Sequence, residues 1–243
     1  MTSVTDILEQ LEFKAQDLNY LTPVLIQKIF STLTVKEISL LCVTNRKFDI
    51  VCKQESLWKD KVLSDYGIEK KYGATWRETA QRMSEINMIN LNGKWINGET
   101  YRELLGEDIE LLFITKTNLL SSFVNNDKDA AVELMLNLSE EEIQYIANEV
   151  LGRQFTDDEL DEIYHINSRE IRVIEAVILV IYDQSVPFLP GTANAFSGSG
   201  LTGISVSPKD FILDLINPIM YVMQFSMFSD SDLVKFIQHE RRY

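Results

Sequence analysis

The sequence predicts a mainly α-helical protein in two parts, a unit of short helices near the N-terminus and a larger helical domain after it. Three observations lead to this prediction. Apolar residues recur at helical spacing along most of the 243 residues. Signatures of the form Ser/Thr-x-x-Glu, which cap helix starts, open several of these stretches. Glycine, proline and serine concentrate between residues 186 and 208, where a long loop is expected.

Composition and charge disfavour several classes of protein. The chain is 45% hydrophobic and 25% charged, which is ordinary for a globular protein and argues against disorder throughout. Its net charge is −14 and its pI is about 4.6. Such a chain repels nucleic acid unless it displays a concentrated basic patch, and its basic clusters, such as Lys70-Lys71 and Arg241-Arg242, are short. No nucleic-acid partner is expected.

The cysteine count and the hydropathy pattern predict an intracellular protein. Cys42 and Cys52 are too few for a secreted disulfide scaffold, so both are expected to be buried small hydrophobes in a reducing compartment. The N-terminus lacks the layout of a signal peptide. The longest apolar run, 171–182, is interrupted by charges, so no membrane span is expected. We expect the cytoplasm or nucleus of a eukaryotic host cell.

The first part, up to about residue 85, divides into short helices. An amphipathic helix is expected in residues 1–18. Thr22 and Pro23 then start a second helix, because threonine caps helices and proline is tolerated at the first helical position. Three further helix starts are predicted by capping boxes at Thr34–Glu37 and Thr75–Glu78 and by a cap at Ser56. Gly67 is predicted to end the helix that Ser56 begins.

Two Asn-Gly pairs flank Trp95 and mark the region between the two parts. Asn-Gly supplies the positive φ angles of a type I′ turn, so a small β-hairpin is expected near 89–96. The boundary between the parts is placed at 85–98.

The second part, residues 98–243, is predicted to be all-helical. Capping boxes at Ser139–Glu142 and Thr156–Glu159 open two of its helices, and Gly152 ends the first of them. The most apolar helix is expected at 168–182. The other expected helices are 101–105, 109–123, 127–136, 209–228 with a kink or break at Pro218, and 229–240.

The segment LTPVLIQKIFSTLTVKEISLLCVTNRKFDIVCKQESLWKDKV resembles an F-box. F-boxes typically contain Leu-Pro, a Lys-Ile-Phe-Ser-x-Leu helix end, a Val-Lys-Asp-Leu helix, a Val-x-x-x-(Arg/Lys)-(Phe/Trp) segment and a terminal Leu-Trp. The corresponding residues here are Leu21, Lys28–Ser31, Leu33, Val35–Ile38, Val43, Lys47-Phe48 and Leu57-Trp58. The resemblance covers residues 19–64, and the F-box-like domain with its extension is taken as 19–85.

The sequence also departs from the F-box pattern in two places. Pro23 lies one position late, and Val24 replaces the acidic residue that often follows the proline. The extension DYGIEKKYGATWRETA resembles the aromatic-rich tail that follows the F-box in some proteins, particularly those of large DNA viruses.

The resemblance implies a non-enzymatic adaptor that binds Skp1, and through it a cullin–RING ubiquitin ligase, while the rest of the chain recruits a target protein. A three-helix unit of this size is too small to bury all its apolar side chains, which fits an interface. The residues predicted to form the Skp1-type interface are Leu21, Pro23, Leu25, Ile26, Ile29, Phe30, Leu33, Ile38, Val43, Phe48, Leu57 and Trp58. The alternative is a structural or virion scaffold whose F-box-like helices pack within the chain.

No motif in the sequence predicts catalysis, a cofactor or a metal site. The acidic run Thr156–Glu162 lacks the alternating ligands and the glycine of an EF-hand and fits a helix N-terminus. The loop at 186–208 is either a connector or a target-binding element. If it binds a target, the residues expected to contact that target are Phe188, Leu189 and Phe196.

Overall fold

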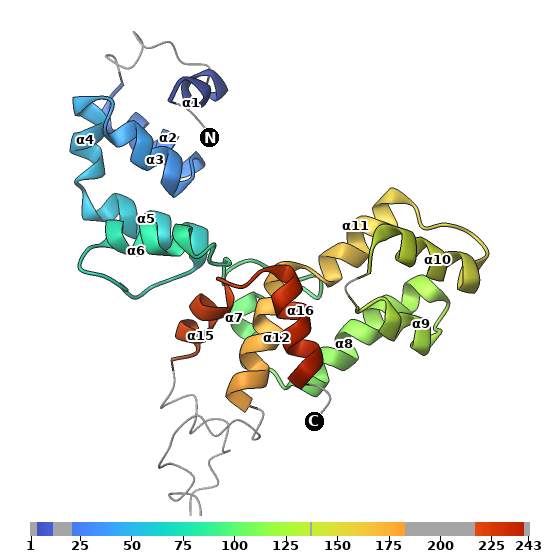
Figure 1. Cartoon of the computed structure of the whole chain (residues 1–243). Coiled ribbons are helices and arrows are strands. Elements are labelled where there is room, and N and C mark those ends of the chain that lie inside the picture. The colour runs from blue at the N-terminus through green and yellow to red at the C-terminus, as the bar shows by residue number, and fades with distance from the viewer. Residues whose placement is uncertain (1–3, 12–20, 137, 183–216, 241–243) are drawn as a thin grey trace, which may run out of the picture. The chain divides into compact units, whose positions relative to one another are not determined.

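We describe the protein from a computed structural model, which covers residues 4–11, 21–136, 138–182 and 217–240 (Figure 1). These residues are mainly helical, as predicted, and contain no β-strand. The chain divides into two units, residues 1–92 and 93–243, so the division falls inside the interval 85–98 expected from the sequence. None of the helices in the described part has the length and apolar character needed to cross a lipid bilayer.

Six helices make up the described part of the first unit. Their bounds are α1 Val4–Gln10, α2 Pro23–Thr32, α3 Val35–Cys42, α4 Arg46–Cys52, α5 Glu55–Tyr66 and α6 Trp76–Glu85. Helices α3 and α4 pack against each other, α2 packs on α4, and α5 and α6 form the most extensive helix pair. Helix α1 contacts α3, so the apolar face of α3 is covered from more than one side.

Side-chain caps set most of the helix starts. Thr34 and Glu37 form the predicted capping box, in which the Glu37 carboxylate accepts the Thr34 backbone N–H at 2.8 Å. At α6 the box is incomplete, because the Glu78 carboxylate accepts the N–H of Ala74 and not that of Thr75. Gly67 ends α5 with φ of +69°, a conformation that side chains with a Cβ rarely adopt.

The second unit is built around α12, Arg169–Tyr182. Figure 1 shows this helix beside α15 and α16, and it also contacts α7 and α8. Six residues of α12 are fully enclosed: Ile171, Val173, Ile174, Ala176, Val177 and Ile178. Such burial on all sides is typical of a helix at the centre of a domain, as the sequence predicts for 168–182.

The described residues of the second unit form seven more α-helices and one short 3₁₀ helix. Their bounds are α7 Tyr101–Leu104, α8 Ile109–Ser121, η2 Ser122–Val124, α9 Lys128–Glu133, α10 Glu140–Leu151, α11 Asp157–Ile166, α15 Pro218–Phe225 and α16 Asp230–Glu240. The capping boxes predicted at Ser139 and Thr156 are both present. The acidic run after Thr156 therefore begins a helix, where carboxylates interact favourably with the helix dipole.

The β-hairpin predicted near 89–96 is wrong. The region contains turns and one isolated antiparallel bridge, between Lys94 and Thr100. A type I′ turn needs positive φ at both central residues. Neither residue of Asn92-Gly93 has a positive φ, and in Asn97-Gly98 only the glycine has it, with φ of +92°. The flanking residues also lack the alternation that would give a strand one buried face.

Three other predicted helices differ in extent from the helices that the structure describes. The helix expected in residues 1–18 is described only as α1, because residues 12–20 lie outside the described part. Pro218 begins α15 after the extended residue Asn217, which agrees with the expected break at this proline, and residues 209–216 lie outside the described part. Helix α9 ends at Glu133, short of the expected Leu136.

The two cysteines are bonded to each other, which corrects the expectation of two separate buried hydrophobes. Both are buried as predicted, at 4% exposure for Cys42 and 1% for Cys52. They end α3 and α4, and their Cα atoms are 6.0 Å apart. The packing of the two helices brings these ends together, which sequence spacing alone does not reveal. Because disulfides persist mainly in oxidising environments, the cysteines no longer support a reducing compartment.

We expect reduction of the disulfide to destabilise the first unit selectively. A cross-link between residues separated by 10 positions restricts the unfolded chain by roughly 2–3 kcal/mol. Urea unfolding with and without a phosphine reductant measures the loss. The variant Cys42→Ala/Cys52→Ala is the control, since the reductant cannot change its stability. Two thiols that react with a thiol reagent in the denatured, unreduced chain would show that the bond is absent.

Candidate partner-binding surface

The predicted interface residues begin at α2, which is held by a cap at its start and by a hydrogen bond to the start of α5. The Leu25 N–H donates to the Thr22 hydroxyl at 3.3 Å, which caps the helix as the sequence predicts. The Gln27 amide donates to Oε1 of Gln54 at 2.8 Å and joins α2 to the start of α5. Helix α2 therefore presents a fixed face to the interior and a fixed face to solvent.

Most of the predicted interface lies inside the chain. Eight of the twelve residues are buried: Leu21, Ile26, Phe30, Leu33, Ile38, Phe48, Leu57 and Trp58. The rings of Phe30 and Phe48 pack at 5.6 Å between centroids. These eight side chains belong to the core of the folded chain and offer no accessible contact to a partner, so their assignment as direct contacts is corrected here.

Four predicted residues reach solvent. Pro23 is exposed, Leu25 is 42% exposed and Val43 is 82% exposed, while Ile29 is partly buried. Leu25 and Ile29 are four residues apart and share one face of α2. These four residues are the accessible remainder of the predicted surface.

The sequence reasoning missed three further exposed apolar residues. They are Val24 at 75%, Leu40 at 40% and Ile50 at 53% exposure. Leu40 and Ile50 lie off the helical stripes that bury their neighbours, and that displacement is a signal readable from the sequence. We define the docking surface as the accessible apolar residues on or beside α2–α4: Pro23, Val24, Leu25, Ile29, Leu40, Val43 and Ile50.

Polar contacts tie the helices beneath this surface together. The Lys61 ammonium donates to the Ser31 carbonyl at 3.2 Å and lies 3.0 Å from the Asp65 carboxylate, although Lys61 is only 7% exposed. Burial raises the pKa of Asp65, while the neighbouring Lys61 opposes that shift. Lys61 thereby links α5 to the last turn of α2.

Across the described residues, no three His, Cys, Asp or Glu side chains come together in a way that could hold a metal ion. The candidate loop residues Phe188, Leu189 and Phe196 lie outside the described part of the chain.

No known family model, curated protein or solved structure matches the chain. The likeness to an F-box therefore depends on the sequence motifs quoted above.

Proposed function

We propose that the first unit binds a Skp1-type adaptor through the docking surface, and that the chain acts as a non-enzymatic substrate adaptor of a cullin–RING ubiquitin ligase. The sequence resemblance supplies the identity of the partner. The target would be bound by the second unit. In this proposal the eight enclosed residues hold the short helices in place, and the exposed residues make the contact.

One observation supports this proposal above the others. Five large apolar side chains on or beside three consecutive short helices, from Val24 to Ile50, are at least 40% exposed although the same helices bury a full core. A few side chains at the centre of an interface commonly cost about 2 kcal/mol or more of binding free energy when they are truncated. A partner that covers these residues would remove them from water, which favours association.

The variant Leu25→Ala/Val43→Ala is expected to bind purified Skp1 roughly thirtyfold or more weakly than the parent chain. Both side chains reach solvent, so the stability of the unit changes little. Isothermal titration calorimetry measures the affinity.

The matched control for this titration is Leu111→Ala/Ile114→Ala, which removes two side chains of similar exposure from α8 in the second unit. The control should bind as the parent does. No binding of Skp1 to the parent chain, or equal binding by the Leu25→Ala/Val43→Ala variant, would contradict the proposal.

A scaffold protein is the second candidate. The burial of eight of the twelve predicted contact residues favours it, because this alternative expects the F-box-like helices to pack within the chain. Stoichiometric recovery of the chain from purified particles, together with no affinity for Skp1, would favour the scaffold.

A further inference from the structure

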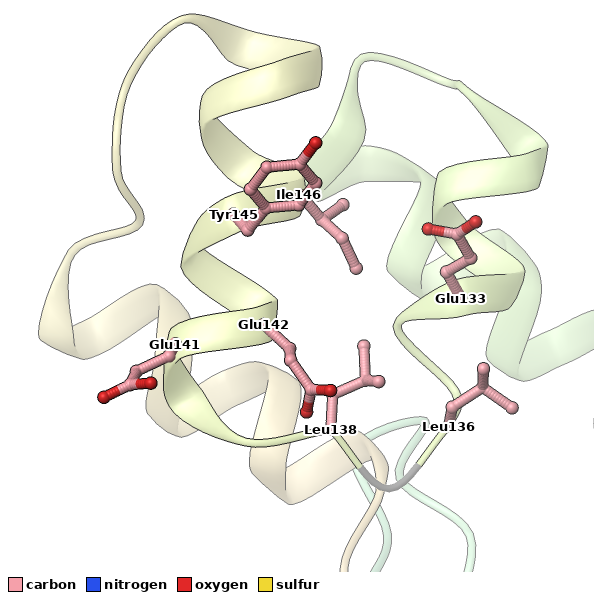
Figure 2. A pocket seen from close by; sticks show the side chains of 7 residues that line it. All are labelled: Glu133, Leu136, Leu138, Glu141, Glu142, Tyr145 and Ile146. Carbon is pink, nitrogen blue, oxygen red and sulfur yellow. The ribbon is translucent and has the colours of Figure 1, made fainter.

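A groove lies between the end of α9 and the first turns of α10 in the second unit. Its volume is about 380 Å³, and it is lined by Glu133, Leu136, Leu138, Glu141, Glu142, Tyr145 and Ile146. Figure 2 shows Leu138 and Ile146 pointing into the space between the two helices, with Leu136 at its edge. Leu136 is 43% exposed and Tyr145 is 65% exposed. The floor is thus apolar and open to solvent.

The rim of this groove is acidic. Glu133 comes from α9, while Glu141 and Glu142 come from α10 (Figure 2). Glu142 is already used in the capping box with Ser139, whose hydrogen bonds lower its pKa. No hydrogen bond or ion pair within the described residues engages the carboxylates of Glu133 and Glu141. These two groups are therefore available to a ligand.

Most of the net negative charge of the chain lies in the segment that contains the groove. Residues 127–167 contain twelve carboxylates and two cations, Lys128 and Arg153, so they carry ten of the fourteen net negative charges. Among the described residues of this segment, only Glu159 forms an ion pair, with Arg153. Unneutralised charge of one sign attracts ligands of the opposite sign and speeds their association.

A second depression continues beside the groove. Its volume is about 620 Å³, and its lining includes Glu141 and Tyr145, which also line the first. Tyr145 therefore lies between two hollows on the exposed side of α10. An aromatic side chain in this position can contact a ligand on either side with little loss of conformational entropy.

We propose that this groove binds a basic amphipathic helical segment of another protein. Aliphatic residues at positions i, i+3 and i+4 of such a segment fit the floor formed by Leu136, Leu138 and Ile146, as in other complexes where a helix lies in a groove. Lysine or arginine on its flanks fits the rim formed by Glu133 and Glu141. The inference does not depend on Skp1 binding by the first unit.

The test uses the full chain and a fluorescein-labelled peptide that repeats Leu-Lys-Lys-Leu, so that leucines cover one face of the helix. Fluorescence anisotropy should show saturable binding. Raising the salt concentration from about 0.05 M to about 0.5 M should weaken that binding roughly tenfold, because exposed charges are screened. A peptide with glutamate in place of lysine keeps the apolar pattern and should not bind.

Variants of the groove separate specific docking from general attraction. Tyr145→Ala should weaken binding roughly tenfold, and Glu133→Gln/Glu141→Gln roughly fivefold. Glu149→Gln/Asp161→Asn removes the same charge from exposed positions of α10 and α11 outside the groove, and Tyr164→Ala removes an exposed tyrosine of α11. Both of these controls should change the affinity less than about twofold.

Three results would overturn the inference. The first is no binding of the basic peptide. The second is an equal loss of affinity in the groove variants and in their controls, which would show diffuse attraction to an acidic surface. The third is a dimer of the parent chain in light scattering that dissociates in Tyr145→Ala, because the groove would then bind a second copy of the chain.

Discussion

Replacing Lys116 with methionine is expected to destabilise the second unit by about 3–5 kcal/mol. The Lys116 ammonium on α8 lies 2.9 Å from the Glu175 carboxylate on α12, and each side chain is only 3% exposed. Methionine keeps much of the volume but leaves the carboxylate buried without that ammonium. Urea unfolding of the full chain gives the loss, and hydrogen exchange of the α8 and α12 amides assigns it to the second unit.

Two further variants test the cause of this loss. Lys116→Met/Glu175→Leu should recover most of the stability, because an apolar pair of similar volume can replace a buried ion pair. Lys128→Met removes an exposed lysine of α9 and should change stability by less than about 0.5 kcal/mol. A single Lys116→Met variant as stable as the parent would show that water or another group compensates for the lost ammonium.

Local signals in the sequence predict where the helices of this protein start and stop. The cap at Thr34 and the αL glycine at Gly67 depend on residues within one turn of each other, so their geometry follows from sequence neighbours. The same holds for the capping boxes at Ser139 and Thr156. Several helix starts in both units could therefore be predicted without knowledge of packing. The cap expected at Ser56 is wrong, because α5 begins at Glu55 after Gln54, which makes no side-chain cap hydrogen bond.

Features that depend on packing could not be predicted in this way. The Cys42–Cys52 bond and the Lys116–Glu175 pair each join two different helices, and sequence spacing does not reveal which helix ends or faces meet. Which residues of the predicted interface reach solvent could not be predicted, for a related reason. A stripe of apolar residues marks the face of a helix, but only the neighbouring helices determine which edge of that stripe they cover.

Trp58 illustrates the difference between a core residue and a contact residue. The F-box resemblance implies a role at the interface, yet the side chain is only 1% exposed. Its indole N–H donates to the Cys52 carbonyl at 2.7 Å, which connects α5 to the end of α4. The Arg77 guanidinium of α6 lies 5.5 Å from the centre of its ring. Three helices therefore meet at this residue.

Trp58→Ala is expected to destabilise the first unit by about 3–5 kcal/mol, because it opens a cavity and leaves the Cys52 carbonyl without its donor. Trp58→Phe should cost less, about 1–2 kcal/mol, since it keeps most of the buried surface. Ile50→Ala, at an exposed position of the adjacent α4, should stay within about 0.5 kcal/mol. Urea unfolding measures these changes in the free energy of unfolding, and hydrogen exchange of the α4–α6 amides assigns them to the first unit.

Measuring the Skp1 affinity of Trp58→Phe and Trp58→Ala separates the two roles of Trp58. A core role predicts that Trp58→Phe retains the parent affinity once it is folded, because the side chain does not reach the surface. A direct contact role predicts unchanged stability and a loss of affinity in Trp58→Ala. The second result would require Trp58 to leave the core on binding, and would return it to the docking surface together with Leu25 and Val43.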